Sequence, residues 1–112
     1  MKYLLVFIMT LVSNAVCASS IDNVTITKIA INHSSGNYVF IKLDRAPDRI
    51  TCSTNGGWDY TLSLNDEGYK NMYAMMLSAF MAGHKVDIKG LAVPACNEFP
   101  AIESLNSIYI TK

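Results

Sequence analysis

The chain has 112 residues, 9 basic and 9 acidic side chains, and a hydrophobic content of 51%. This length suits one small domain. The balanced charge gives no electrostatic reason to expect nucleic acid or an anionic membrane as a partner.

Residues 1–18 have the pattern of a signal peptide. Lys2 supplies a short positive n-region of bacterial type, and residues 3–12 form an apolar run. A run of about ten residues matches an h-region and is too short to cross a bilayer. Small residues then precede a cleavage point after Ala18, which predicts Ser19 as the new N-terminus.

Cleavage at this point predicts an exported protein, either periplasmic or secreted. Removing 18 of the 112 residues leaves a single domain, residues 19–112, of 94 residues, with 8 basic and 9 acidic side chains. We expect no stable membrane insertion after cleavage. Lipid attachment at Cys17 is the alternative, and it fits less well because Val16 is large for the position before a lipidated cysteine.

Two cysteines, Cys52 and Cys96, remain in the predicted mature chain. In an exported protein of this size, an even pair predicts a disulfide. The bond would close a loop of about 45 residues and contribute on the order of 4 kcal/mol to the free energy of unfolding. A metal-binding or redox pair would need a CxxC spacing or nearby histidines, and His33 and His84 are scattered. We therefore expect no metal site and no cofactor.

Alternating apolar residues predict strands on both sides of a single helix. The first predicted strand, Val24–Ile31, contains a one-residue shift of phase, which indicates a β-bulge or a bend. The later strands are expected at Tyr38–Leu43, at Ile50–Thr54 with Trp58–Leu64 as one interrupted strand, at Lys85–Lys89 and at Ile102–Thr111.

The helix is expected between Asn65 and Gly83, with Asp66 as an N-terminal cap and Gly83 as a left-handed C-terminal cap. One apolar stripe at helical spacing should be buried within the chain; it comprises Tyr69, Met72, Tyr73, Met76 and Phe80. Three more apolar residues lie largely off this stripe: Met75, Leu77 and Met81. They either fill a thick core or contact another copy of the chain.

Three strands, one helix and two strands predict a mainly β protein of the OB-fold type. In this interpretation, a bent first strand lets a five-stranded sheet (β-β-β-α-β-β) curl into a barrel, and the helix closes its open end. The alternative is an open antiparallel α+β sheet with the helix packed on one face.

Two stretches carry a resemblance to a known family. The junction AFMAGHKVDIKG at residues 79–90, and the closing stretch from Cys96 to Ile108-Tyr109-Ile110, are similar to the OB-fold B subunits of bacterial pentameric toxins, of the subtilase-cytotoxin and pertussis type. The resemblance implies binding to cell-surface glycans and assembly into rings of five. It identifies no sugar-contacting residue in this chain, and small periplasmic OB-fold proteins without a toxin role share the same topology.

We therefore expect a binding protein and not an enzyme. The serines lack a G-x-S-x-G context, so no catalytic residue is assigned. The OB-fold interpretation predicts a glycan or similar polar ligand at the barrel rim, near the Ser34–Asn37 turn and the Leu91–Ala101 loop. The candidate ligand-binding residues are Ser34, Ser35, Asn37, Tyr38 and Trp58.

Two alternatives accompany this prediction. Trp58 has the same parity as Tyr60, Leu62 and Leu64, which favours a place in the core over a place on the rim. The function itself has an alternative of another class. The chain would then be a periplasmic or envelope protein-interaction module, an inhibitor or assembly factor, with a protein partner and no small ligand.

Overall fold

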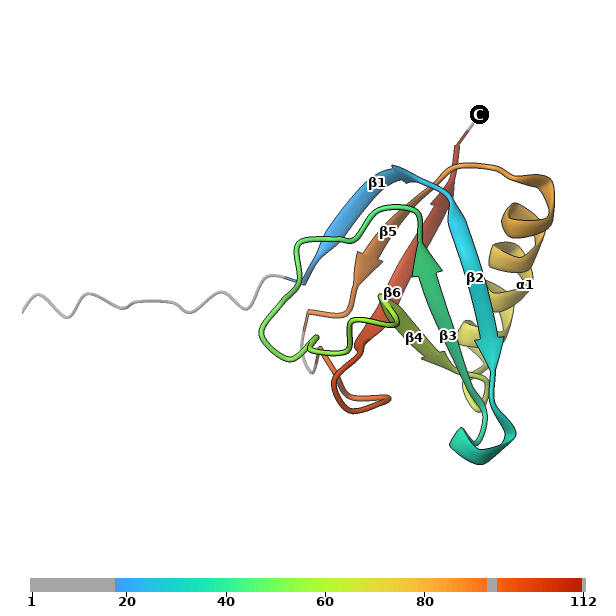
Figure 1. Cartoon of the computed structure of the whole chain (residues 1–112). Helices are drawn as coiled ribbons and strands as arrows, with labels where there is room; N and C mark the ends of the chain where they lie inside the picture. Colours follow the sequence, from blue (N-terminus) through green and yellow to red (C-terminus); the bar gives the residue numbers. More distant parts are fainter. Residues whose placement is uncertain (1–17, 93–94, 112) are drawn as a thin grey trace, which may run out of the picture.

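The computed structural model describes residues 18–92 and 95–111 (Figure 1). Most of the predicted signal peptide, including Cys17, lies outside the described residues, so the signal peptide and its lipidated alternative stay predictions. Among the described residues, no helix has the length and apolar character needed to cross a membrane. The elements are β1 Ser20–Val24, β2 Ile26–Ile31, the 3-10 helix η1 His33–Ser35, β3 Tyr38–Leu43, β4 Tyr60–Ser63, α1 Glu67–Ala82, β5 Val86–Gly90 and β6 Glu103–Ile110.

The strands form one curled, mixed sheet in the order β1-β5-β6-β4-β3-β2 (Figure 1). The prediction of a mainly β protein with one helix is confirmed. The sheet has six strands where five were predicted, because the predicted first strand corresponds to β2, and β1, which overlaps that prediction only at Val24, was missed. The all-antiparallel sheet of the alternative prediction is wrong, since β4 and β6 pair in parallel.

The predicted irregularity in the first strand is confirmed. The β2–β3 register shifts between Ile26 and Lys28, where the apolar alternation changes phase. The break between β1 and β2 falls at Thr25, whose backbone N–H and Oγ1 donate to the Asp44 carboxylate at 3.2 and 2.9 Å. Just before it, Asn23 adopts a left-handed backbone with φ 57°, which Asn tolerates better than most residues. The chain thereby turns from pairing with β5 to pairing with β3.

The predicted strand at Ile50–Thr54 is wrong. Residues 44–59 form a long loop, and the regular strand after it is limited to Tyr60–Ser63. The backbone N–H groups of Thr54 and Asn55 both donate to the Ala101 carbonyl, so this part of the loop bonds to another loop and not to a strand. The alternation of apolar residues in the sequence does not show that these N–H groups form their hydrogen bonds outside the sheet.

The predicted disulfide between Cys52 and Cys96 is confirmed, with Cα atoms 6.1 Å apart. The bond links the 44–59 loop to the loop between β5 and β6. The prediction had placed Cys52 in a strand, so the bond joins two loops where a strand and a loop were expected.

Helix α1 covers one side of the curled sheet and contacts β2, β4 and β6 (Figure 1). Asp66 caps it by accepting from the Tyr69 N–H, and Gly83 ends it in a left-handed conformation with φ 69°. Met76 is fully buried, and the other members of the predicted stripe pack on the core while partly exposed: Tyr69, Met72, Tyr73 and Phe80. The predicted stripe therefore faces the core, but the prediction that all five residues are buried holds for Met76 alone.

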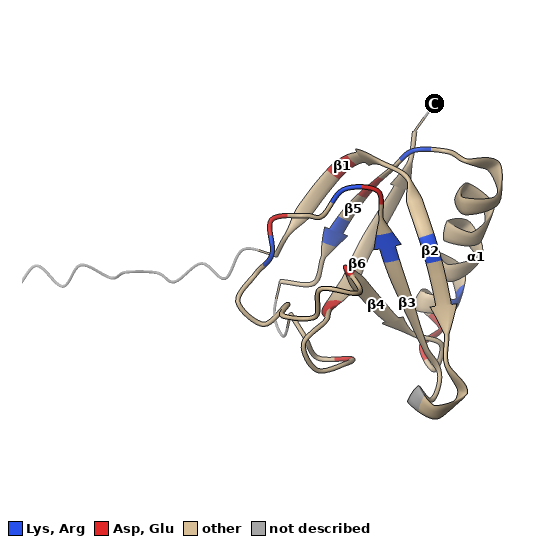
Figure 2. Cartoon of the chain, viewed as in Figure 1, with Lys and Arg blue, Asp and Glu red and all other residues tan. Residues whose placement is uncertain are grey.

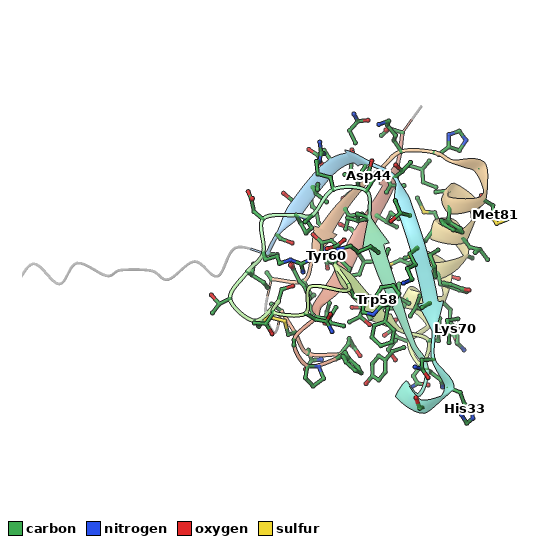
Figure 3. The ribbon with its side chains drawn as sticks, viewed as in Figure 1. His33, Asp44, Trp58, Tyr60, Lys70 and Met81 are labelled. Atoms are coloured by element: carbon green, nitrogen blue, oxygen red, sulfur yellow. A yellow bond between two sulfur atoms is a disulfide. The ribbon has the colours of Figure 1, made fainter. Side chains whose placement is uncertain are left out.

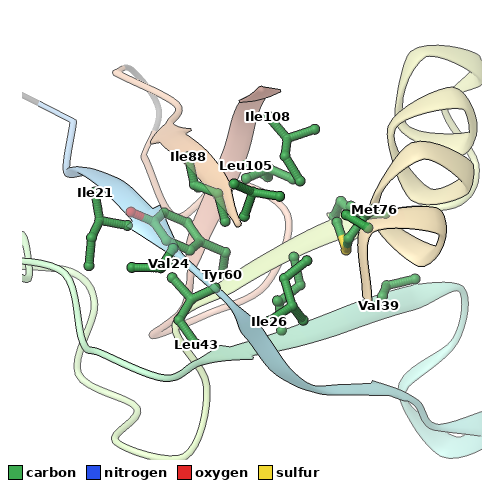
Figure 4. Close-up of a cluster of buried hydrophobic side chains, with 14 residues drawn as sticks. Ile21, Val24, Ile26, Val39, Leu43, Tyr60, Met76, Ile88, Leu105 and Ile108 are labelled. Atoms are coloured by element: carbon green, nitrogen blue, oxygen red, sulfur yellow. The ribbon is translucent and has the colours of Figure 1, made fainter. Parts of the chain in front are cut away.

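The main core lies inside the curl, where Tyr60 is surrounded by aliphatic side chains from several strands (Figure 4). Tyr60 has no exposed surface, although it carries a polar hydroxyl. Burial raises the pKa of the Tyr60 phenol well above its ordinary value. The hydroxyl is satisfied by the Ser19 Oγ at 2.6 Å.

Replacing both Cys52 and Cys96 with serine should lower the Tm of the mature protein by roughly 15 °C or more, because a bond that closes a long loop contributes about 4 kcal/mol. Thermal unfolding followed by circular dichroism measures the change. A Tm equal to that of the oxidised wild type would contradict a structural role for the bond.

Candidate functional site

A small hollow of about 200 Å³ opens on the side of β3 that faces away from the main core. β2, β3 and three loop segments contribute to its wall. The residues that line it are Ala30, Asn32, Phe40, Asn55, Trp58, Phe99 and Ile102. Its volume is below the roughly 300–1,000 Å³ of pockets that enclose drug-sized ligands, so it suits about one ring of a larger ligand.

Aromatic side chains form the floor and one wall of the hollow. Phe40 and Phe99 meet edge to face with ring centroids 5.0 Å apart, and Phe40 and Trp58 lie 5.7 Å apart. Tyr38 extends the cluster by meeting Phe99 edge to face at 5.5 Å. These distances and angles are those of favourable aromatic pairs. The cluster is a second, smaller apolar group on the outer side of the sheet.

The backbone around Trp58 is held by Arg49. The Arg49 Nη1 donates to the carbonyl oxygens of Asn55 and Trp58, each at 3.2 Å. The Arg49 Nη2 donates to Asp59 Oδ1 at 2.7 Å. One guanidinium therefore connects the segment that carries Trp58 to a buried carboxylate.

Asp59 has no exposed surface. Besides Arg49, its carboxylate receives the Leu43 backbone N–H at 2.8 Å and lies 3.6 Å from the Lys42 Nζ. A buried charge is tolerated when it is paired and hydrogen-bonded in this way. Trp58 is the residue before Asp59, so these contacts hold it close to the end of β3.

A cation lies beside the indole. The Lys28 Nζ is 5.1 Å from the centroid of the Trp58 ring, a distance typical of a cation–π contact. The hollow therefore combines an indole, a neighbouring positive charge and two phenylalanine rings.

Two amides supply polar groups at the hollow. The Asn32 Oδ1 accepts from the backbone N–H and the hydroxyl of Ser34, and the Asn55 Oδ1 accepts from the Gly57 N–H. Among the hydrogen bonds of the described residues, the NH₂ group of neither side chain is a donor. Each amide can therefore offer N–H donors to a hydroxyl or carbonyl of a ligand.

Of the four predicted ligand-binding residues whose side chains the structure describes, Trp58 alone lines the hollow. Tyr38 is next to it through Phe99. Ser34 is exposed in the β2–β3 turn and bonds to Asn32, and Asn37 is exposed and donates to the Asn65 Oδ1. Figure 3 shows His33 at the outer tip of this turn. The side chain of Ser35 lies outside the described residues.

Sequence reasoning missed Asn32, Asn55, Phe40 and Phe99. Phe40 had a usable signal, because it has the parity of Tyr38 and faces away from Val39 and Ile41. Phe99 lies in the Leu91–Ala101 loop that was predicted to border a ligand site. The two asparagines had no signal beyond turn chemistry.

Helix α1 carries few charged residues (Figure 2), and three large apolar side chains on it are exposed. Met75, Leu77 and Met81 are 39%, 38% and 77% exposed. Figure 3 shows Met81 pointing away from the sheet. The expected exposure is therefore found, and a contact with another copy through these residues stays a prediction.

No cluster of three or more His, Cys, Asp or Glu side chains suited to a metal ion occurs in residues 18–92 and 95–111. The absence of a cofactor and of enzymatic activity stays a prediction. Comparisons of the chain with protein-family models, curated proteins and solved structures find no significant match.

Replacing Asp59 with Asn should lower the free energy of unfolding by about 3 kcal/mol, because removing one partner of a buried pair leaves the Arg49 charge uncompensated. Trp58 is the single tryptophan, so its fluorescence should report a looser environment in the folded variant. Asp48→Asn, at an exposed position of the same loop, is the control and should change neither quantity. Equal stability of the two variants would contradict the anchoring role.

Replacing Met81 with Lys should convert an oligomer to a monomer without unfolding it, because a charge on an apolar contact surface must be desolvated on association. Light scattering and circular dichroism measure the two properties. Asn71→Lys, at an exposed polar position of the same helix, should keep the wild-type mass. A wild-type protein that is monomeric at high concentration would contradict the predicted contact.

Proposed function

We propose that this chain is an exported, non-enzymatic binding protein with an OB-fold-like barrel. In this proposal, the hollow at Trp58 holds part of a glycan or a similar polar ligand. The observation that supports this proposal most strongly is which strands and loops of the sheet line the hollow.

The strand order supports the OB-fold part of the proposal. If β1 and β2 are counted as one bent strand, the described part of the chain has five strands. That bent strand pairs at one end with β3 and at the other with β5. A five-stranded Greek-key barrel has this arrangement, with a helix between its third and fourth strands.

The position of the hollow supports the binding part. OB-folds bind oligonucleotides and oligosaccharides on the face of their second and third strands, between the loops after the first and fourth strands. Counted in this way, Phe40 lies on the second strand, Asn32 begins the first of these loops, and Phe99 lies in the second. The hollow therefore opens where an OB-fold binds its ligands.

The chemistry of the wall favours a sugar over a nucleic acid. The C–H face of a sugar ring can pack on an indole, and its hydroxyls can accept from the amides of Asn32 and Asn55. Nucleic acids require many phosphate contacts from Lys and Arg. Lys28 and Lys42 are the nearby lysines, and Lys42 is already close to Asp59.

The proposal includes an oligomer like the rings of the toxin B subunits that the sequence resembles. The exposed Met75, Leu77 and Met81 on α1 support this part. The same observation also favours the second candidate function. An apolar helix surface can bind a different protein, and the chain would then be an interaction module without a small ligand.

Replacing Trp58 with Ala should reduce glycan affinity about fivefold, since stacking on an aromatic ring is worth about 1 kcal/mol. A glycan array on the mature protein identifies the ligand, and quenching of Trp58 fluorescence in the wild type gives its dissociation constant. Loss of binding in the variant is measured by calorimetry.

Tyr109→Ala is the matched control. Tyr109 is 49% exposed and also has a lysine over its ring, with the Lys89 Nζ 5.9 Å from the centroid. Its removal should leave affinity unchanged. A blank array together with specific capture of a protein partner would contradict glycan binding and support the interaction module.

A further inference from the structure

A buried polar cluster surrounds the residue predicted to become the N-terminus. The Ser19 backbone nitrogen donates to Glu103 Oε2 at 3.0 Å, and the Ser19 hydroxyl donates to Glu103 Oε1 at 2.5 Å. Since that hydroxyl has one hydrogen, the Tyr60 hydroxyl donates to Ser19 Oγ, 2.6 Å away. Ser19 is 6% exposed and Glu103 is 1% exposed, so the cluster is closed to solvent.

The backbone of the sheet shapes this cluster. The Ser19 carbonyl accepts from the Gly90 N–H at 2.9 Å, which fixes Ser19 beside the end of β5. A Cβ at Gly90 would lie 1.6 Å from Glu103 Oε2, so a side chain there would displace the carboxylate. The residue before β1, the end of β5 and the start of β6 thus form a cradle for one carboxylate.

The Glu103 carboxylate has no cation at ion-pair distance among the described residues. The Arg49 charge acts on it only from a distance, because Arg49 is paired with Asp59. Burial raises the pKa of the Glu103 carboxyl, and the Ser19 hydrogen bonds oppose that shift. An uncompensated buried carboxylate of this kind is costly in a folded protein.

We propose that cleavage of the Ala18–Ser19 bond supplies the missing cation, and that Glu103 is the binding site for the new α-ammonium group of Ser19. The inference rests on the export that is part of the proposed function. It adds a binding site and a defined role for the mature N-terminus. The Ser19 nitrogen already donates to Glu103 Oε2. Cleavage converts this nitrogen from a neutral amide into a positively charged ammonium group.

The chemistry is a simple hydrolysis by a signal peptidase. Water adds across the bond between the Ala18 carbonyl carbon and the Ser19 nitrogen. The oxygen of that water becomes part of the Ala18 carboxylate. The freed amine takes up a proton at neutral pH, since an α-amino group has a pKa of about 7.7–8.0. Because Ser19 is buried in the folded domain, cleavage precedes folding, and the ion pair forms as the sheet closes.

The pH dependence follows from the two partners. The folded α-amino group gains a carboxylate, so its pKa rises, and its stabilisation is present below about pH 8 and lost as pH rises through the folded value. Glu103 sets the lower pH limit of this stabilisation, because its protonation at acid pH removes the negative partner of the ammonium group. The other titratable or charged groups near the pair are Tyr60, Arg49 and Asp59. Cleavage adds no charge to any of them.

The test compares a mature chain that begins at Ser19 with one that begins at Ala18, which replaces the ammonium by a peptide N–H at the same atom. The Ser19 chain should melt at least about 4 °C higher at pH 6.5. The difference should shrink toward both acid and alkaline pH. Titration followed by NMR should place the pKa of the Ser19 α-amino group above about 8.0.

Glu103→Gln should abolish the Tm difference between the two chains, and Glu98→Gln, in the loop before β6, is the control that should preserve it. If the two chains that carry Glu103→Gln do not fold, the pH profile and the α-amino pKa of the wild type decide the question. Equal Tm values for the two wild-type chains, with an ordinary α-amino pKa, would overturn the pairing.

Mass spectrometry of the protein exported by a bacterial host separates this inference from the proposed function. An N-terminus at Ser19 supports the processing site. An exported protein that begins elsewhere would overturn the inference while leaving export and glycan binding intact. Retention of the full chain in the cytoplasm would overturn both the export and the inference.

Discussion

The outer part of the structure depends on one buried carboxylate, that of Asp59. It completes the end of β3 by accepting the Leu43 N–H, and it binds the Arg49 guanidinium that gathers the carbonyl groups of the 44–59 loop. This loop has no regular secondary structure, yet its Trp58 ring packs against Phe40 of β3. Without a charge at Asp59, the Arg49 guanidinium would lose its ion-pair partner. The loop would then lose the ion pair around which it is ordered. Trp58 owes its position to this arrangement, because it is the residue before Asp59.

Local patterns predicted most of the fold. The spacing of apolar residues located α1. The two residues predicted to cap this helix, Asp66 and Gly83, cap it in the structure. The phase shift after Ile26 indicated the irregular first strand, since alternation is a direct record of which side faces the core. The 44–59 loop was not predictable in this way, because it is ordered by Arg49 and Asp59, and a charge pair leaves no periodic signal.

The site was less predictable than the fold. Trp58 was a candidate because of its chemistry, but its parity with Tyr60 favoured the core over the outer side. The parity did not apply, since Trp58 lies outside the strand, in the loop. Phe40 and Phe99 are distant in the sequence and meet only after the two loops fold over the sheet. Residues brought together by tertiary structure in this way cannot be found from spacing within one segment.

The disulfide has a consequence for how the hollow is held together. Cys52 belongs to the loop that carries Trp58, and Cys96 belongs to the loop that carries Phe99, so the bond fastens one wall of the hollow to the other. A reduced chain has the same residues, but the two walls are then held together only by packing and backbone contacts. The disulfide can constrain the hollow in this way only in an oxidising compartment, because the bond does not persist where thiols stay reduced.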